Sequence, residues 1–119
     1  MPNDVTSGDR EILAAAYRWF NARQLDAVLA LMHPDVVWPN GMEGGYVYGH
    51  EGVRAYWTRQ WGMIDPHVEP MKIEMDTEGR AVVEVHQVVR ELSGNVVLDT
   101  TVRHAYTLRD GLIVRMEIE

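Results

Sequence analysis

The apolar pattern of this chain changes its period once, and that change decides which folds are open to it. Before Pro66, apolar residues recur every three or four positions, whereas beyond it they alternate with polar residues. The first spacing predicts helices that bury one face, and the alternation predicts half-buried β-strands. The chain therefore has a helical first half and a sheet-forming second half.

The second half is typical of a meander of antiparallel strands. Short turn sequences at residues 77–79, 93–95 and 109–111 separate four alternating segments. The inward face of the longest strand is expected to hold Val96, Leu98, Thr100, Val102, His104, Tyr106 and Leu108. On the last strand, the alternation predicts that Leu112, Val114, Met116 and Ile118 point inward.

Three helices and a small strand pair are predicted before this sheet. The first helix begins at Asp9 after a flexible tail at residues 1–8, and a shorter one covers residues 25–32. The second ends before Pro34, because the residue preceding a proline avoids the helical conformation. Short strands at residues 36–38 and 46–48 then lead to a third helix, whose apolar stripe is Val53, Tyr56, Trp57, Gln60, Trp61 and Ile64.

These elements predict one α+β domain over residues 9–119. Each helix has an apolar stripe and the sheet has one apolar face, so laying the helices across the sheet buries both. A curled sheet covered in this way leaves a central cavity. Residues 34–57 mix glycines and prolines with aromatic residues, a composition that suits the mouth of such a pocket.

Composition excludes several classes of partner. The formal net charge of −7 repels a phosphate backbone or an anionic membrane. The longest apolar runs fall far short of the roughly 20 residues that a membrane helix needs. There is no cysteine, the histidines lack a metal-binding spacing, and the glycines do not match a phosphate loop. We therefore expect a cytoplasmic protein without nucleic acid, membrane, metal or cofactor.

Three segments of the chain carry a family resemblance: YRWFNARQLDAVLALMHPDVVW, GHEGVRAYW and HAYTLRDGLIVRMEIE. In this order they resemble the nuclear transport factor 2-like superfamily, particularly its SnoaL-like polyketide cyclase and ketosteroid isomerase branches. The resemblance implies a cone-shaped, cystatin-like fold, with three N-terminal helices packed on a curved antiparallel sheet. It also implies homodimers through the outer sheet face and a pocket for a small, largely apolar molecule. The superfamily mixes enzymes with non-catalytic proteins, so the function must be inferred from the site.

Comparison with the ketosteroid isomerase branch implies the candidate site. The position of the general-base aspartate falls on Asn40, whose amide cannot take a proton as a carboxylate does. The position of the hydrogen-bonding carboxylic acid falls on His104, and that of the helix tyrosine most nearly on Tyr17. The catalytic candidates are therefore His104, Tyr17 and Asn40. The candidates for the pocket lining are Trp38, Trp57, Trp61, Gln87 and Tyr106.

Each candidate also has a purely structural explanation. His104 could be a hydrogen-bonded core histidine, Gln87 a satisfied buried amide, and Asn40 a turn residue beside Pro39 and Gly41. Two functions remain open: an enzyme that acts on a carbonyl compound by isomerase, cyclase or dehydratase chemistry, and a non-catalytic module that binds a ligand or another protein. Asn40 favours the second, whereas the inward polar residues favour the first.

Overall fold

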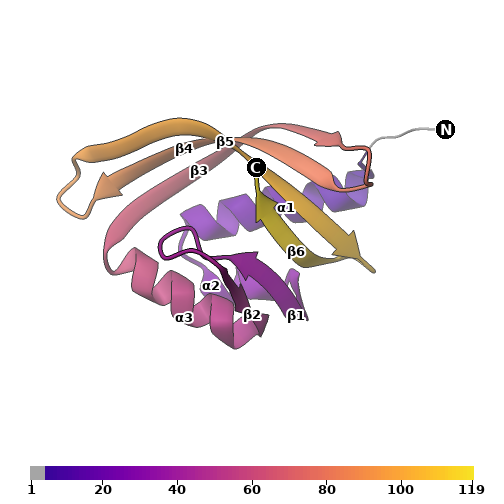
Figure 1. Cartoon of the computed structure of the whole chain (residues 1–119), viewed down its shortest axis with the longest axis horizontal. Coiled ribbons are helices and arrows are strands. Elements are labelled where there is room, and N and C mark those ends of the chain that lie inside the picture. The colour runs from indigo at the N-terminus through magenta and orange to yellow at the C-terminus, as the bar shows by residue number, and fades with distance from the viewer. Residues whose placement is uncertain (1–4) are drawn as a thin grey trace.

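A computed structural model describes residues 5–119 as a single six-stranded sheet with three helices (Figure 1). The helices are α1 (Ser7–Asn21), α2 (Leu25–Leu29) and α3 (Gly49–Trp61). The strands are β1 (Met32–Pro39), β2 (Tyr46–Tyr48), β3 (Ile64–Met75), β4 (Ala81–Glu91), β5 (Val96–Arg109) and β6 (Leu112–Ile118). The predicted α+β class and the antiparallel meander from β3 to β6 are confirmed.

The first two strands are not a separate pair, as the sequence predicted, but belong to the same sheet. Its strand order is β2-β1-β6-β5-β4-β3, and β1 pairs in parallel with β6. Helix α3 therefore follows β1 and β2 instead of preceding the whole sheet. The predicted helix end before Pro34 is wrong, since α2 ends at Leu29 and Pro34 lies within β1. An irregularity in the β1–β6 register between Met32 and Val37 accommodates this proline, which has no N–H for a ladder.

Helix α1 begins two residues earlier than predicted. Thr6 is its N-cap, and the Thr6 hydroxyl accepts a hydrogen bond from the Asp9 amide at 3.1 Å. Ser7 and Gly8 lie in the helix, and Val5 is buried. Part of the segment predicted as a flexible tail is thus ordered structure, while residues 1–4 of that prediction lie outside the described residues.

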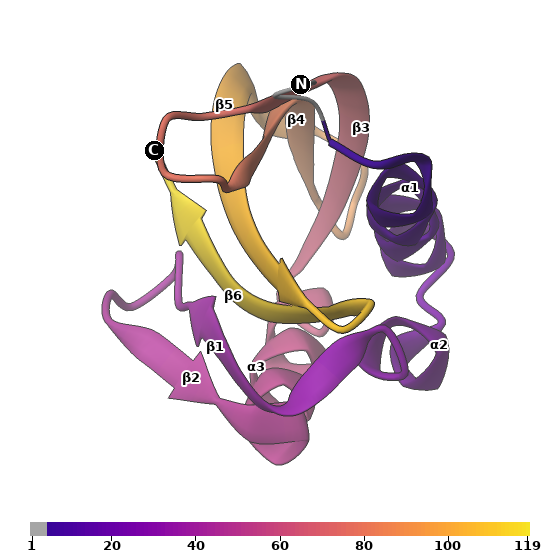
Figure 2. The same ribbon diagram turned by 90° about the vertical axis from the view of Figure 1, so that its right-hand side faces the viewer.

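The C-terminal end of α1 is fastened to β3, which is an edge strand of the sheet. The Asn21 side chain donates to the Val68 carbonyl at 2.7 Å and accepts from the Val68 amide at 2.9 Å. Arg23 also donates to the Pro66 carbonyl at 2.7 Å. These contacts satisfy backbone groups on an edge that would otherwise be open to another strand. They also fix how α1 lies across the sheet (Figure 2).

Strand β6 departs from the predicted alternation. Ile113 and Met116 are buried, whereas Leu112 and Val114 are only half-buried and Ile118 is about half exposed. The reason is a register shift between Thr107 and Leu108 in the pairing of β5 with β6, which changes the face that the first residues of β6 present.

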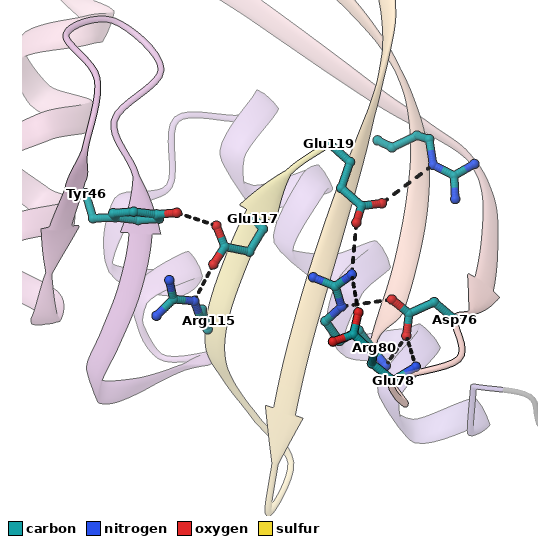
Figure 3. Close-up of polar contacts among 8 residues, drawn as sticks. Tyr46, Asp76, Glu78, Arg80, Arg115, Glu117 and Glu119 are labelled. Atoms are coloured by element: carbon teal, nitrogen blue, oxygen red, sulfur yellow. Dashed lines mark hydrogen bonds and ion pairs between the residues drawn. The ribbon is translucent and has the colours of Figure 1, made fainter.

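Polar contacts hold β6 and the C-terminus to their neighbours (Figure 3). The Tyr46 hydroxyl on β2 donates to Glu117 at 2.6 Å, across the intervening strand β1. Arg80, just before β4, donates to Glu119 at 2.9 Å and to Asp76 at 2.8 Å. These contacts tie β6 to β2, and the C-terminal residue to the segment between β3 and β4. None of the helices in residues 5–119 is long and apolar enough to cross a membrane.

Candidate functional site

A cavity of about 340 Å³ lies between the helices and the curled sheet. All three helices and five of the strands contribute to its wall, which is mainly apolar and aromatic. Within the described chain, no Asp, Glu, Lys or Arg lines it. The polar side chains in the wall are Tyr17, Tyr56, Gln60, Gln87, His104 and Tyr106. This size and composition suit a small ligand that is bound mostly by apolar contact.

Three of these polar side chains form a hydrogen-bonded chain. His104 and Tyr106 point to the same face because they lie two residues apart on β5. Tyr17 reaches them from α1. The Tyr106 hydroxyl donates to the Tyr17 hydroxyl at 2.8 Å, and the Tyr17 oxygen lies 2.8 Å from Nδ1 of His104. The two tyrosines thus hold the imidazole in a fixed orientation.

The direction of this chain determines which nitrogen of His104 carries the proton. When Tyr17 accepts from Tyr106 and donates to Nδ1, the ring proton is on Nε2; when Nδ1–H donates to Tyr17, Nε2 has a lone pair instead. Burial lowers the pKa of His104 to about 4, so the ring is neutral at pH 7. Burial also raises the pKa of Tyr17 and of Tyr106. All three groups are therefore uncharged at neutral pH.

The second ring nitrogen of His104 remains available to a ligand. Among residues 5–119, Nε2 has no hydrogen-bond partner, and His104 is part of the cavity wall. A neutral imidazole with a free N–H can donate a hydrogen bond to a carbonyl oxygen without bringing charge into the cavity. The geometry therefore offers one well-oriented donor in apolar surroundings.

Aromatic rings build the wall beside this donor. Trp38 packs edge-on against Trp57, with ring centroids 5.3 Å apart, and lies 6.1 Å from the ring of Tyr106. Trp61 does not line the cavity. It stacks on Trp57 at 5.8 Å and packs under the Arg23 guanidinium, so it supports the wall from behind.

Asn40 lies outside the cavity wall, in the turn after β1. Its side-chain oxygen accepts hydrogen bonds from the amides of Met42 and Glu43, at 3.1 and 2.9 Å. Its amide nitrogen donates to the Glu43 carboxylate at 3.2 Å. Both ends of the Asn40 amide are used locally, which matches the structural explanation of this residue.

The structure thus brings together most of the predicted site. His104, Tyr17, Trp38, Trp57, Gln87 and Tyr106 line one cavity, whereas Asn40 and Trp61 do not. The sequence reasoning missed Tyr56 and Gln60, which it assigned only to the apolar stripe of a helix. Gln60 was the available signal, because a polar residue within an apolar stripe needs a partner.

The hydroxyl of Tyr56 accepts hydrogen bonds from the Gly41 amide at 3.1 Å and from Nε2 of Gln60 at 3.4 Å. Burial raises the pKa of Tyr56, so it is also neutral at pH 7. Among the described residues, no group of three or more His, Cys, Asp or Glu side chains is placed to hold a metal ion.

Comparison with known proteins gives a consistent family match. Residues 13–116 match the SnoaL-like domain family. The structure is similar to that of TerC, which was co-crystallised with polyporic acid, with 30% identity, a TM-score of 0.82 and coverage of 95% of this chain and 91% of TerC. A nuclear transport factor 2-like protein of unknown function from Burkholderia pseudomallei has 27% identity and a TM-score of 0.82, with coverage of 96% and 91%.

A protein from Pseudomonas putida that is proposed to be a polyketide cyclase shares the fold, with a TM-score of 0.80, 20% identity and coverage of 93% and 90%. No protein of curated function matches the sequence. The nuclear transport factor 2-like fold that the three sequence segments implied is confirmed.

Proposed function

Because the chain belongs to the SnoaL-like domain family, we propose that its cavity binds a small, largely apolar carbonyl compound and that His104 acts on it by acid–base chemistry. The observation that carries the proposal is the neutral His104 imidazole, held by Tyr17 and with Nε2 unpaired among residues 5–119, in a cavity whose described wall has no charged side chain. A donor in such surroundings stabilises negative charge that develops on a carbonyl oxygen more strongly than it would in water.

His104 can also accept a proton at the same atom. If the hydroxyls of Tyr17 and Tyr106 rotate, Nδ1–H donates to Tyr17, and Nε2 then carries a lone pair in place of a proton. A C–H proton of the substrate passes to Nε2, which forms an imidazolium, and returns to another atom of the substrate. The substrate thus loses one proton and regains one, as it does in an isomerase or a cyclase reaction.

The low basicity of His104 restricts the substrates on which this chemistry works. Burial places its pKa at about 4, so it removes only protons that are already acidic. A carbon between two carbonyl groups has such a proton, whereas an isolated ketone does not. The proposed substrate class is therefore an apolar dicarbonyl or a related polyketide-like compound.

A non-catalytic ligand-binding module is the second candidate. It is favoured by the lack of any carboxylate among the described lining residues and by the use of Asn40 in its own turn. The complex of TerC with polyporic acid supports either candidate, since it places a small molecule with a protein of this fold.

We also propose that the protein forms a homodimer through the outer face of the sheet. The three helices all contribute to the cavity on the inner face, so they leave the outer face uncovered. Val88 lies on that face between the cavity-lining residues Gln87 and Val89, and the pattern of alternation points it away from the cavity.

A ligand titration tests the pocket, and a proton-exchange measurement separates the two candidates. With 2-acetyl-α-tetralone, we expect a rise in the thermal midpoint of the wild type and a much smaller rise for His104→Gln. Exchange of the acidic C–H of 2-acetyl-α-tetralone with D₂O, followed by NMR, should be faster with wild type than in buffer.

His86→Gln is the matched control, because His86 is an exposed histidine on the outer face. It should behave as the wild type does in both measurements. Binding without faster exchange would favour the non-catalytic module. Equal stabilisation of wild type and His104→Gln by 2-acetyl-α-tetralone would show that His104 does not contact the ligand.

A further inference from the structure

We propose that Tyr56 and Gln60 of α3 form a second polar subsite in this cavity, which binds a hydroxyl group of the ligand. The inference rests on the function proposed above and narrows the ligand to a neutral hydroxy-carbonyl compound. His104 contacts its carbonyl group, and the α3 pair contacts its hydroxyl.

Tyr56 has an unused donor inside the protein. Its side chain lines the cavity and the residue is only 4% exposed. The hydroxyl oxygen accepts from the Gly41 amide and from Gln60, which uses both of its lone pairs. Within residues 5–119, no acceptor is found for the hydroxyl proton.

Gln60 has an unused acceptor next to this donor. Its Oε1 is buried and has no hydrogen-bond partner in the described part of the chain, although buried amide oxygens are almost always paired. Turning the Gln60 amide over, so that its oxygen and nitrogen exchange places, still leaves one of the two atoms without a partner. Tyr56 could then donate to the oxygen, but the NH₂ group would be left without an acceptor. In either orientation, one buried polar atom of the Gln60 amide lacks a partner, and a turn of this side chain, which lines the cavity, would bring that atom within reach of a ligand.

A hydroxyl group is the ligand group that matches both residues. It can accept the Tyr56 proton and donate its own proton to Oε1 of Gln60. A carbonyl group could only accept, so it would satisfy the exchanged orientation of the Gln60 amide but leave Oε1 unpaired in the other, whereas a hydroxyl group suits both. A carboxylate or an ammonium group would bring a charge into a cavity whose described wall has no charged side chain to balance it.

The two subsites are close enough for one compact molecule. His104 is paired with Ile118 across β5 and β6, so the two side chains are neighbours on the same face. A methyl group built on Gly41 would lie 3.8 Å from Cδ1 of Ile118 and 3.7 Å from the Tyr56 hydroxyl. Ile118 and the space beside Gly41 thus separate the subsites, and a bicyclic skeleton with a carbonyl on one ring and a hydroxyl on the other can span them.

The test compares two ligands that differ by a single hydroxyl group, α-tetralone and 6-hydroxy-α-tetralone. Affinities are measured by isothermal titration calorimetry. We expect the wild type to bind the hydroxylated compound roughly tenfold more tightly, as one or two net hydrogen bonds allow. Tyr56→Phe and Gln60→Met should each bring this preference close to one.

Gln60→Met keeps the length of the side chain and leaves the contact between Tyr56 and Gly41 in place, so it tests the subsite even if Tyr56→Phe disturbs the turn. Tyr48→Phe is the control, since Tyr48 is exposed and does not line the cavity. It should retain the wild-type preference.

The outcomes separate this inference from the function on which it rests. Equal affinity of the wild type for both compounds, or an unchanged preference in Gln60→Met, would overturn the second subsite alone. His104→Gln should weaken both ligands to a similar extent and keep the preference for the hydroxyl. Failure of the wild type to bind either ketone would overturn the subsite, and failure to bind 2-acetyl-α-tetralone as well would overturn the proposed function.

Discussion

At the scale of single residues, burial of His104 links the stability of the fold to pH. The residue is 8% exposed, and its pKa falls from the ordinary 6.5 to about 4 because burial disfavours the charged ring. Between these values the unfolded chain binds more protons than the folded one does. The contribution of the neutral His104 ring to the free energy of unfolding is therefore complete above pH 6.5. It decreases as the pH falls towards 4 and changes no further below that.

We expect this effect to be visible when the wild type is compared with His104→Gln. The difference in their free energies of unfolding should fall by about 3 kcal/mol between pH 7 and pH 4, since each pKa unit corresponds to about 1.4 kcal/mol. Urea denaturation at a series of pH values measures it. Carboxyl groups whose pKa is lowered in the folded protein by hydrogen bonds, such as Glu117 and Asp76, are present in both proteins.

His86→Gln is compared with the wild type over the same pH range as the control for loss of a histidine whose side chain is 44% exposed. A difference between wild type and His104→Gln that does not vary with pH would show that the imidazole is hydrated in solution.

The sequence predicted the orientation of individual site residues better than their partners. Strand alternation placed His104 and Tyr106 on the inward face, because it depends only on neighbouring positions. The bond between Tyr17 and His104 joins residues 87 positions apart, and local patterns carry no information on such a contact. Asn40 was assigned to the site from its family position and Trp61 from helical spacing. Neither kind of evidence specifies where a residue in a turn, or at the end of a helix, directs its side chain.

At the scale of elements, the start of α3 decides how that helix presents Tyr56, Trp57 and Gln60 to the cavity. Gly49 begins the helix with a φ of +72°, in the left-handed region, and a Cβ built on it would lie 3.1 Å from the carbonyl oxygen of Pro34. The chain therefore needs glycine here both for its backbone conformation and for the close approach of β1.

Gly49→Ala should destabilise the fold more than Gly79→Ala does. Gly79 has a similar φ of +80°, but a Cβ there meets nothing within 4 Å. Each substitution costs about 1 to 2 kcal/mol for the left-handed conformation. Gly49→Ala should cost about 1 kcal/mol more, because the contact with a backbone oxygen forces β1 or α3 to move. Thermal and urea unfolding of the two variants measure the difference.

Equal destabilisation by the two alanines would mean that β1 and α3 yield to the added methyl group without cost. The expected movement of α3 should also weaken ligand binding in Gly49→Ala and leave it unchanged in Gly79→Ala. That second readout separates a shift of the helix from a general loss of stability.

Secondary structure was predicted well where a periodic pattern was long, as in α1, α3 and the strands β3 to β5. The errors fall where pairing over long range overrides local signals. Pro34 is a helix-stop signal, yet it lies in a strand because β6 pairs with β1 and the register irregularity tolerates it. The shift near Leu108 likewise gave β6 a buried Ile113 that alternation alone had assigned to the outer face.

At the scale of the whole molecule, the helices cover one face of the sheet and leave the outer face open. The helices pack on the inner face, around the cavity, and the β4–β5 hairpin projects beyond the rest of the chain (Figure 1). At that hairpin, Leu92 and Val96 are 63% and 51% exposed and do not line the cavity. Neighbouring exposed apolar side chains on a small protein favour contact with another molecule.

We expect these surfaces to bring two copies together through the outer sheet face. Sedimentation equilibrium of the wild type should then give about twice the chain mass of 13.6 kDa. Val88→Arg places a long charged side chain on that face and should give the monomer with the fold intact by circular dichroism, because the side chain keeps two sheets from packing together even where Asp99, opposite it on β5, balances its charge. Ala55→Arg adds the same charge on the exposed side of α3 and should remain dimeric.

A wild type that sediments as a monomer at all concentrations, or a dimer that persists in Val88→Arg, would contradict the proposed interface. Since the cavity opens on the inner face, Val88→Arg should still bind α-tetralone as the wild type does.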